Sequence, residues 1–202
     1  PSMHTKIQDN LQGLGVDTTS DTAWMPITKT WSPLLAAQEM QSGIDRIEPD
    51  SYTTLLGMMM WTNQTAPRSL IPSALSSYSR NPGKGDMECL IQSGKHFLST
   101  SHIPIVYYMN PHATDIQVAV PQHGYVDAGE TGETDGSGRK AIIIKSGAPG
   151  TSSGGIITTS NKIKHSNNTP MDETDALVDC LGRISLSRTL SEEMAGLRNN
   201  KY

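Results

Sequence analysis

Cysteine is scarce in this chain of 202 residues, which contains only Cys89 and Cys180. Two cysteines so far apart provide neither the closely spaced ligands of a zinc site nor the disulfide framework of a small secreted domain. We therefore interpret both as free thiols in a reducing compartment. This interpretation predicts an intracellular protein, without indicating which compartment holds it.

Long apolar runs are also missing, because the strongest of them extends only from Leu55 to Trp61. A membrane-spanning helix needs about 18 to 20 mainly apolar residues, so the sequence predicts no spanning segment. Residues 1–4 show no basic region followed by an apolar one, and no secretory signal is visible. A chain that begins in this way is expected to be a fragment or a processed product.

The chain carries no excess of basic charge, since its formal net charge at pH 7 is −4 and its pI is about 5.8. Affinity for nucleic acid depends mainly on neutralising phosphates, so this balance argues against a free-standing nucleic-acid-binding protein. The hydrophobic fraction of 35% and the aromatic fraction of 5% indicate a polar, soluble chain with a modest core. Its length allows one substantial core or two small ones, since domains typically contain about 100 to 150 residues.

The pattern of apolar residues divides the chain into two regions at about residue 100. Residues 1–100 are predicted to be mostly helical, and we interpret them as a connection-like region. Apolar positions three or four residues apart, with proline and acidic residues at helix entries, indicate this. The predicted helices cover residues 5–14, 50–60, 70–78 and 86–98, and residues 17–33 are predicted to be extended.

Residues 101–202 differ in character, because short β-rich runs alternate with polar loops. Strands are predicted at residues 103–108, 116–120, 123–126, 140–145 and 156–159. Thr169, Pro170 and Asp172 provide the N-cap, first position and capping acid of a helix that is predicted to run to about Leu197. This helix is expected to cover one face of the sheet and to bury Leu177, Leu181 and Ile184.

Two acidic residues are candidates for a metal site. Asp127 follows the predicted strand at 123–126, and Asp175 lies in the first turns of the predicted helix. Carboxylates delivered in this way could meet around Mg²⁺, which proteins bind through one or two carboxylates plus water and phosphate oxygens; nucleic-acid hydrolases use such sites. The spacing equally supports a structural role, with Asp175 favoured by the helix dipole and Asp127 as a turn residue. On spacing alone, both interpretations stay open.

Several segments of the second region resemble the RNase H domain of copia-type retrotransposon polyproteins. Residues 123–128 (HGYVDA) are similar to the Gly-Tyr-(Ser/Val)-Asp-Ala-Asp strand that opens that domain, and Arg139-Lys140 follows at about the right distance for the family's Arg-Lys/Arg-Ser-Thr segment. Residues 154–177 match, without a gap, the stretch from Gly-Gly-Pro-Ile-Ser-Trp to Ser-Thr-Glu-Ala-Glu-Tyr.

The resemblance continues upstream, so that it covers almost the whole chain. Residues 52–61 are similar to the family's Tyr-Arg-x-Leu-Val-Gly-x-Leu-Met-Tyr, and residues 66–82 to its Thr-Arg-Pro-Asp to Leu-Ser-Arg-Tyr-x-x-Asn-Pro stretch. Residues 95–100 resemble its Arg-Tyr-Leu-Lys-Gly-Thr, and residues 11–26 resemble the end of its reverse transcriptase. Each match is loose, but their order and intervals agree with the family.

The resemblance implies an α/β fold, in which a helical N-terminal portion packs on a partial RNase H-like mixed sheet with a long C-terminal helix. It implies nuclease ancestry directed at RNA–DNA hybrids, with Asp127 as a metal ligand. Asp175 falls on the position of the helix glutamate, and Glu173 on that of a neighbouring glutamate. These three residues are the implied catalytic set, with Asp127 and Asp175 as ligands of a weak Mg²⁺ site and no other cofactor.

The departures from the family pattern concern the same site. Asp175 is one methylene shorter than glutamate, and Gly129 and Glu130 stand where the family has a second aspartate and a tryptophan. The family's third metal ligand lies on a strand that would follow Tyr202. The resemblance therefore implies a segment that is catalytically incomplete by itself.

Two classes of function follow from these observations. One is an enzyme segment that acts on RNA–DNA hybrids when joined to the remaining parts of its polyprotein. The other is a retrotransposon-derived structural or scaffold subunit without catalytic activity. In the second case we expect other protein chains to cover the open edge of the sheet, because exposed strand edges are normally protected.

Overall fold

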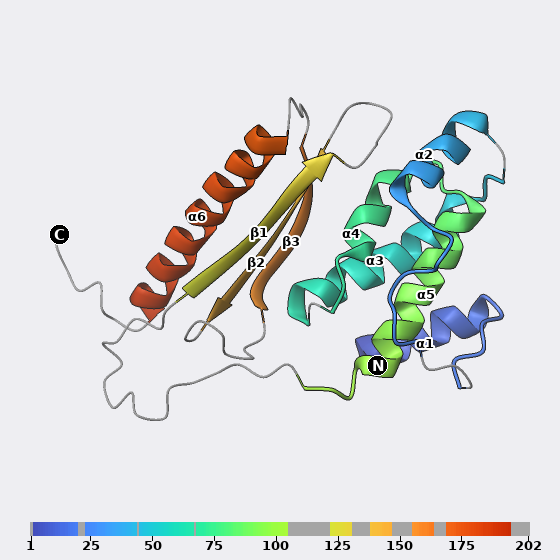
Figure 1. Cartoon of the computed structure of the whole chain (residues 1–202). Coiled ribbons are helices and arrows are strands. Elements are labelled where there is room, and N and C mark those ends of the chain that lie inside the picture. Colours follow the sequence, from blue (N-terminus) through green and yellow to red (C-terminus); the bar gives the residue numbers. More distant parts are fainter. Residues whose placement is uncertain are drawn as a thin grey trace.

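The computed structural model describes residues 2–19, 23–43, 45–66, 68–104, 122–130, 138–146, 155–163 and 169–194. The chain is mixed α/β, with N-terminal helices followed by a three-stranded antiparallel sheet that packs against a long C-terminal helix (Figure 1). None of the helices among these residues is long and apolar enough to cross a membrane.

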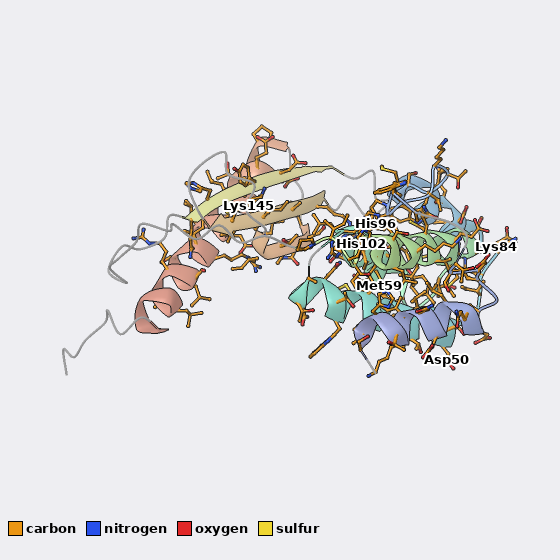
Figure 2. All side chains as sticks on the ribbon, turned by 90° about the horizontal axis from the view of Figure 1, so that it is seen from below. Asp50, Met59, Lys84, His96, His102 and Lys145 are labelled. Carbon is orange, nitrogen blue, oxygen red and sulfur yellow. The ribbon has the colours of Figure 1, made fainter. Side chains whose placement is uncertain are left out.

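The N-terminal region is helical, in agreement with the sequence analysis. Its helices are α1 (Met3–Gly13), α2 (Pro33–Ser42), α3 (Pro49–Thr65), α4 (Ile71–Leu75), the short 3-10 helix η1 (Ser76–Tyr78) and α5 (Lys84–Thr100). One apolar cluster holds α1, α3 and α5 together, and its fully buried members include Ile7, Leu11, Tyr52, Leu55 and Leu90. Figure 2 shows Met59 inside this group of helices and Asp50 and Lys84 at its periphery.

Helix α2 begins inside a segment that we expected to be extended. The Ser32 hydroxyl accepts a hydrogen bond of 3.2 Å from the Leu35 N–H, and Pro33 occupies the first turn. Gly43 ends the helix in the left-handed conformation, with φ of 66°. Serine before proline at the start and glycine at the end are standard helix limits. These signals are present in the sequence, and the apolar pattern between them is too weak to reveal the helix.

The core of this region contains a buried polar bridge. The Trp31 Nε1–H donates a hydrogen bond of 2.8 Å to Asp86 Oδ1, and the Gly83 N–H donates one of 2.8 Å to Asp86 Oδ2. Asp86 stands at the third position of α5, so it caps that helix and fixes the segment before α2 at the same time. Tyr52 is also buried, and its hydroxyl donates to the Leu75 carbonyl at 2.8 Å.

The sheet contains β1 (Gln122–Glu130), β2 (Gly138–Ser146) and β3 (Gly155–Ile163) in the order β1-β2-β3. Each strand extends the corresponding predicted one by several residues. Both pairings are antiparallel, because no crossover connection links the described strands. We had predicted a mixed sheet from the sequence. The strands predicted at 103–108 and 116–120 lie almost entirely outside the described residues.

Helix α6 (Thr169–Met194) packs along β1 and β2 through small residues. Ala176 and Cys180 are buried against the sheet, and a Cβ added to Gly124 would overlap the Cys180 Sγ atom. Leu177 and Leu181 are 50% and 57% exposed, so the prediction that they are buried is wrong. A close approach of helix and strand requires a row of small side chains at the contact, and the bulky leucines therefore face outward. Ile184 packs on the sheet as expected.

The helical region contacts the sheet at the edge that β3 forms. Helices α3 and α4 lie against β3 (Figure 1). The Arg139 guanidinium of β2 donates hydrogen bonds to the Ala74 carbonyl of α4, at 3.2 Å, and to the Ser77 hydroxyl of η1. The described sheet is therefore bounded by helices at β3, and β1 forms the edge remote from them.

Candidate functional site

Asp127 of β1 lies on the face of the sheet that points away from α6. Its neighbours Val126 and Ala128 pack in the clusters that face α6. Side chains alternate between the two faces of a strand, and the Asp127 side chain is exposed. The aspartate of the motif at 123–128 is therefore directed away from the helix that carries its expected partner.

Asp175 lies on the opposite side, at the interface of α6 with β2. Its Oδ2 atom accepts a hydrogen bond of 2.7 Å from the Lys140 Nζ. Lys140 is paired in register with Ala128, which places it on the α6 face of the sheet. Contrary to the expectation from the sequence, the carboxylates of Asp127 and Asp175 do not meet at one site. Glu173 is exposed on α6.

A network of ion pairs occupies the region around Asp175. The Lys140 ammonium is 3.2 Å from Asp179 Oδ2 as well as 2.7 Å from Asp175, and Arg183 Nε donates a hydrogen bond of 2.9 Å to Asp179 Oδ1. The Lys140 side chain is only 13% exposed, whereas that of Asp175 is 58% exposed. Two carboxylates thus surround one partly buried ammonium group, which connects β2 to α6.

Electrostatics favour the charged forms of this network. Burial lowers the pKa of Lys140, but its hydrogen bonds to Asp175 and Asp179 outweigh burial, so the pKa lies above its ordinary value. Burial likewise raises the pKa of Asp179, but the hydrogen bonds from Arg183 and Lys140 outweigh it and the pKa lies below its ordinary value. The interaction of opposite charges therefore dominates over desolvation at both residues.

The residues implied by the resemblance do not fit a Mg²⁺ site. A ligand pair must reach one ion, and Asp127 and Asp175 lie on opposite faces of the sheet. Asp175 is already engaged by a cation of the chain itself. Among the described residues, no group of three or more His, Cys, Asp or Glu side chains could hold a metal ion. The chemistry of this interface is that of a structural ion-pair network.

Sequence reasoning missed the members of this network other than Asp175. Asp179 and Arg183 are four residues apart, which is the spacing of paired charges on one helix face. That signal is visible in the sequence. Lys140 gives no such signal, because its role depends on the register that places it opposite Ala128 and beneath α6.

The face of the sheet that carries Asp127 is polar and partly open. Tyr125 is 51% exposed, and the Lys145 Nζ lies over its ring, 5.5 Å from the centroid. A lysine in this position makes a cation–π contact with the tyrosine. The two residues come from neighbouring strands, and they cover part of the surface between β1 and β2.

Helix α6 exposes several large apolar side chains. Six of its described large apolar side chains are at least half exposed. We call the four in the first half of the helix the outer α6 stripe: Met171, Leu177, Val178 and Leu181. Leu186 and Leu190 lie further along the helix. Isolated exposed apolar residues are ordinary, but several on one helix favour a surface that another group of atoms covers.

No family model, curated protein or solved structure matches this chain. The resemblance to copia-type polyproteins therefore rests on the sequence motifs alone.

Proposed function

We propose that this chain is a catalytically inactive interaction module of RNase H-like ancestry, derived from a copia-type retrotransposon polyprotein. Its role is that of a structural subunit in a larger assembly. The order of three antiparallel strands and one long helix supports this ancestry, since it is compatible with the first half of an RNase H-like domain. By ancestry, the substrate class would be an RNA–DNA hybrid.

The observation that carries the inactive assignment is the position of Lys140. Its ammonium lies between Asp175 and Asp179, at 2.7 and 3.2 Å. A two-metal nuclease would need the carboxylate oxygens of Asp175 for divalent ions, and a fixed ammonium competes for them. Asp127, the other implied ligand, projects from the far side of the sheet. Of the three acids that the resemblance implies, Asp175 thus serves the contact between helix and sheet.

A second observation supports the interaction role. Strand β1 pairs with β2 along one edge, and among the described residues no strand pairs with its other edge. The outer α6 stripe runs along the helix that packs on the same strand. We infer that the partner is a polypeptide that adds a strand to β1 and covers this stripe with apolar side chains.

The inactive assignment is tested by a hybrid-cleavage assay in Mg²⁺ and in Mn²⁺. The chain is compared with Asp127→Asn and Asp175→Asn variants on a labelled RNA–DNA duplex. We expect no cleavage above that of buffer from any of the three proteins. Cleavage by the unmodified chain that Asp127→Asn abolishes would overturn the proposal in favour of an enzyme segment.

The partner surface is tested by the state of the purified chain. Because the stripe is exposed and no strand of the described residues pairs with the outer edge of β1, we expect concentration-dependent association in analytical ultracentrifugation. A Val178→Lys/Leu181→Lys double variant should reduce it. Leu35→Lys is the matched control, since Leu35 is an exposed apolar residue of α2, outside the stripe. A chain that is monomeric at all concentrations and stable to heating would contradict the partner surface.

A further inference from the structure

Leu177 and Leu181 lie on the side of α6 that faces the outer edge of β1. Asp175 and Asp179 of the same helix contact Lys140, which belongs to β2. Each leucine follows one of these aspartates by two residues, and two residues of an α-helix turn the chain through about 200°. The two leucines, 50% and 57% exposed, therefore point away from β2, above the edge of β1 that pairs with no strand of the described residues.

The symmetry of a strand pair allows a second copy of the chain to occupy this edge. When two identical strands pair in antiparallel orientation, a two-fold axis passes between them, perpendicular to the sheet. Two chains joined at β1 would form one continuous antiparallel sheet that carries both copies of α6 on the same face. The described helices of the N-terminal region contact the sheet at the edge formed by β3, and β1 lies at the edge remote from them (Figure 1).

The spacing of strands and helices brings the two copies of α6 into contact. Neighbouring strands lie about 4.8 Å apart, so the axis passes about 2.4 Å from β1. Helix α6 packs along both β1 and β2, and a helix placed midway between these strands lies about 4.8 Å from the axis. The two helices are then about 10 Å apart, and packed helices are separated by about 8 to 10 Å. Large side chains such as leucine fill the space between helices at this separation.

One register of this pairing aligns the exposed leucines with each other. Val126 packs both in the cluster of Ala176 and in the cluster of Cys180, so it lies beneath the turn of α6 between them. A two-fold axis at Val126 therefore passes beside the middle of this turn. In the pair of helices, Leu177 of each copy then lies beside Leu181 of the other. The contact is isologous, because the same two side chains are used by both copies.

The charges at the ends of the leucine contact are complementary in the same arrangement. Glu173 lies four residues before Leu177 and Arg188 lies seven residues after Leu181, so both are on the leucine side of α6. Both side chains are exposed. In the antiparallel pair, Glu173 of one copy lies within about one helical turn of Arg188 of the other. A parallel pair of helices would instead bring like charges together, so these residues favour the antiparallel orientation.

The open face of the sheet agrees with this register. In an antiparallel pair with its axis at Val126, Tyr125 of one copy lies directly opposite Asp127 of the other. The Lys145 Nζ lies over the Tyr125 ring, 5.5 Å from its centroid. The exposed Asp127 carboxylate of the second copy therefore lies on the same surface as this ammonium group. Opposite charges are thus placed near each other on both faces of the joined sheet.

We propose that the partner of β1 and α6 is a second copy of this chain. The two copies form a symmetric dimer through antiparallel pairing of their β1 strands and through contact of Leu177 with Leu181 between their α6 helices. In this dimer the two leucines are buried instead of exposed. The proposal rests on the partner surface of the proposed function and names the molecule that occupies it.

The test mixes two single variants of the full chain. The unmodified chain should dimerise in sedimentation velocity with a dissociation constant of about 100 μM or below. Leu177→Glu and Leu181→Lys should each weaken dimerisation about tenfold or more, because a charge is placed against a leucine of the other copy. In an equal mixture the two new charges attract each other, and one contact between Leu177 and Leu181 is kept. The mixture should therefore dimerise about tenfold more tightly than either variant alone, and native mass spectrometry should identify the product as the heterodimer.

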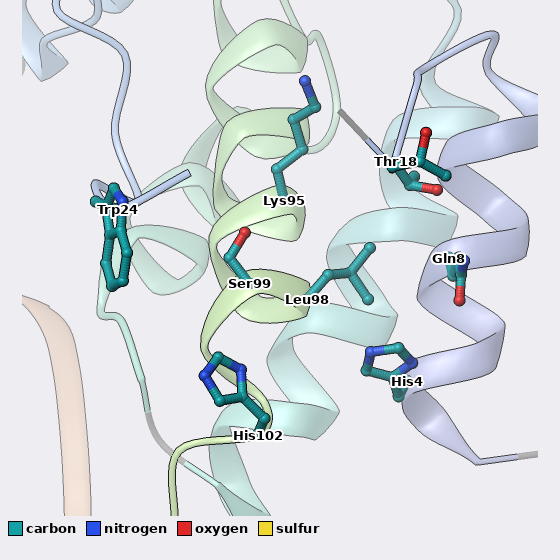
Figure 3. Close-up of a pocket in the computed structure, with 9 residues that line it drawn as sticks. His4, Gln8, Thr18, Trp24, Lys95, Leu98, Ser99 and His102 are labelled. Atoms are coloured by element: carbon teal, nitrogen blue, oxygen red, sulfur yellow. The ribbon is translucent and has the colours of Figure 1, made fainter. Parts of the chain in front are cut away.

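Leu186 and Leu190 provide the matched control on the same helix. They are 60% and 50% exposed and also stand four residues apart, but their positions place them on the side of α6 that carries Asp179. Leu186→Glu mixed with Leu190→Lys should dimerise as the unmodified chain does. Trp24→Lys is a control in the helical region, since Trp24 is 68% exposed at the groove bordered by α1 and α5 (Figure 3). Far-UV circular dichroism checks that each variant is folded.

Three outcomes would overturn the proposal. A chain that is monomeric up to about 1 mM would show that the edge is occupied otherwise, by another protein or by a segment such as the strand predicted at residues 116–120. Association that the control variants weaken as much as Leu177→Glu does would indicate nonspecific apolar attraction. A mixture that dimerises no better than its separate variants would exclude the symmetric contact but leave the partner surface of the proposed function in place. The cleavage assay tests the inactive assignment separately, because its result does not depend on association.

Discussion

Gly124 of β1 lies directly beneath Cys180 of α6, so closely that a Cβ at position 124 would overlap the Cys180 Sγ atom. Ile184 Cδ1 would lie 3.0 Å from the same Cβ. The absence of a side chain at this one position allows the helix to settle on the strand. The outward orientation of Leu177 and Leu181 follows from this arrangement.

We expect Gly124→Ala to destabilise the chain by about 1 to 3 kcal/mol, the usual cost of adding volume to a packed interface. Urea denaturation followed by circular dichroism measures the change. Gly129→Ala is the control on the same strand, because a Cβ at position 129 meets no atom within 4 Å. Equal effects of the two substitutions would show that backbone conformation, and not the contact with Cys180, causes the loss.

Helix α6 illustrates what the sequence could predict and what it could not. Its existence and its start at Thr169 follow from the N-cap threonine, proline and capping acid. Its orientation does not follow, because an apolar pattern favours burying the largest side chains. Burial of Ala176 and Cys180 depends on Gly124, which is about 50 residues away in sequence and contributes only as the partner of a tertiary contact.

The candidate site shows the same difference between local and nonlocal information. Asp127 was predicted to follow a strand directly, whereas it lies within β1, and the helix pattern correctly predicts that α6 carries Asp175. Whether the two carboxylates meet depends on which face of the sheet the Asp127 side chain lies on, because a shift by one residue moves a side chain to the other face. The burial of Ala128 against Ala176 places Ala128 on the face that contacts α6, and therefore Asp127 on the other face. No local pattern in the sequence reveals this orientation.

Asp86 provides a prediction for the helical core. Its two oxygens accept hydrogen bonds from the Trp31 indole and the Gly83 N–H, each of 2.8 Å, and its side chain is buried. Asparagine has one acceptor oxygen, so Asp86→Asn leaves one of these donors unsatisfied. We expect a loss of about 1.5 to 3 kcal/mol, typical of hydrogen bonds to a charged group, measured by thermal and urea denaturation.

Asp50→Asn is the matched control for Asp86→Asn. Asp50 is also a first-turn acid, at the start of α3, but it is exposed. It interacts with the helix dipole, so its replacement should cost about 0.3 to 1 kcal/mol at most. If both variants lost the same stability, the bridge between Trp31 and Asp86 would have no special importance.

The ion-pair network leads to a prediction about pH. The pKa of Asp179 lies below its ordinary value because the hydrogen bonds from Arg183 and Lys140 outweigh burial. Its contribution to stability is therefore present above the ordinary aspartate pKa of about 3.9 and is lost as pH falls through the lower folded value. The pKa of Lys140 is raised, so its contribution is present below about pH 10.4 and is lost as pH rises through the folded value.

Lys140→Met should consequently cost about 1 kcal/mol at pH 7, as expected for two partly exposed ion pairs, and much less at pH 2 to 3. Urea denaturation at several pH values measures this difference. Lys145→Met is the control on the same strand. Lys145 contacts the Tyr125 ring on the other face of the sheet, so the cost of its replacement should not vary over this acid range. A pH-independent cost for Lys140→Met would contradict the assignment.

The effect of Mg²⁺ on the melting temperature tests whether Asp127 and Asp175 bind an ion together. An ion bound only by the folded chain would raise the melting temperature by mass action. Because Asp175 is held by Lys140 and Asp127 lies on the other face, we expect about 10 mM Mg²⁺ to shift the melting temperature no more than the same ionic strength of NaCl. A Mg²⁺-specific increase that Asp127→Asn and Asp175→Asn both abolish would show that the two carboxylates bind one ion.

The two cysteines give the last prediction. Both side chains are buried, and burial raises the pKa of Cys89 from 9.0 to about 11 and also raises that of Cys180. The thiolate is the reactive form, so the folded chain should react with a thiol-specific disulfide reagent at pH 8 far more slowly than the chain unfolded in guanidinium. In the unfolded chain two thiols should react.

Because Cys89 ionises at lower pH when unfolded, its contribution to stability is present below about pH 9 and falls by about 1.4 kcal/mol per pH unit towards pH 11. Cys89→Ala should make this alkaline slope shallower, although Tyr52, whose pKa burial also raises, maintains part of it. Rapid reaction of both thiols in the folded chain, or an unchanged slope in the variant, would show that Cys89 is accessible to solvent.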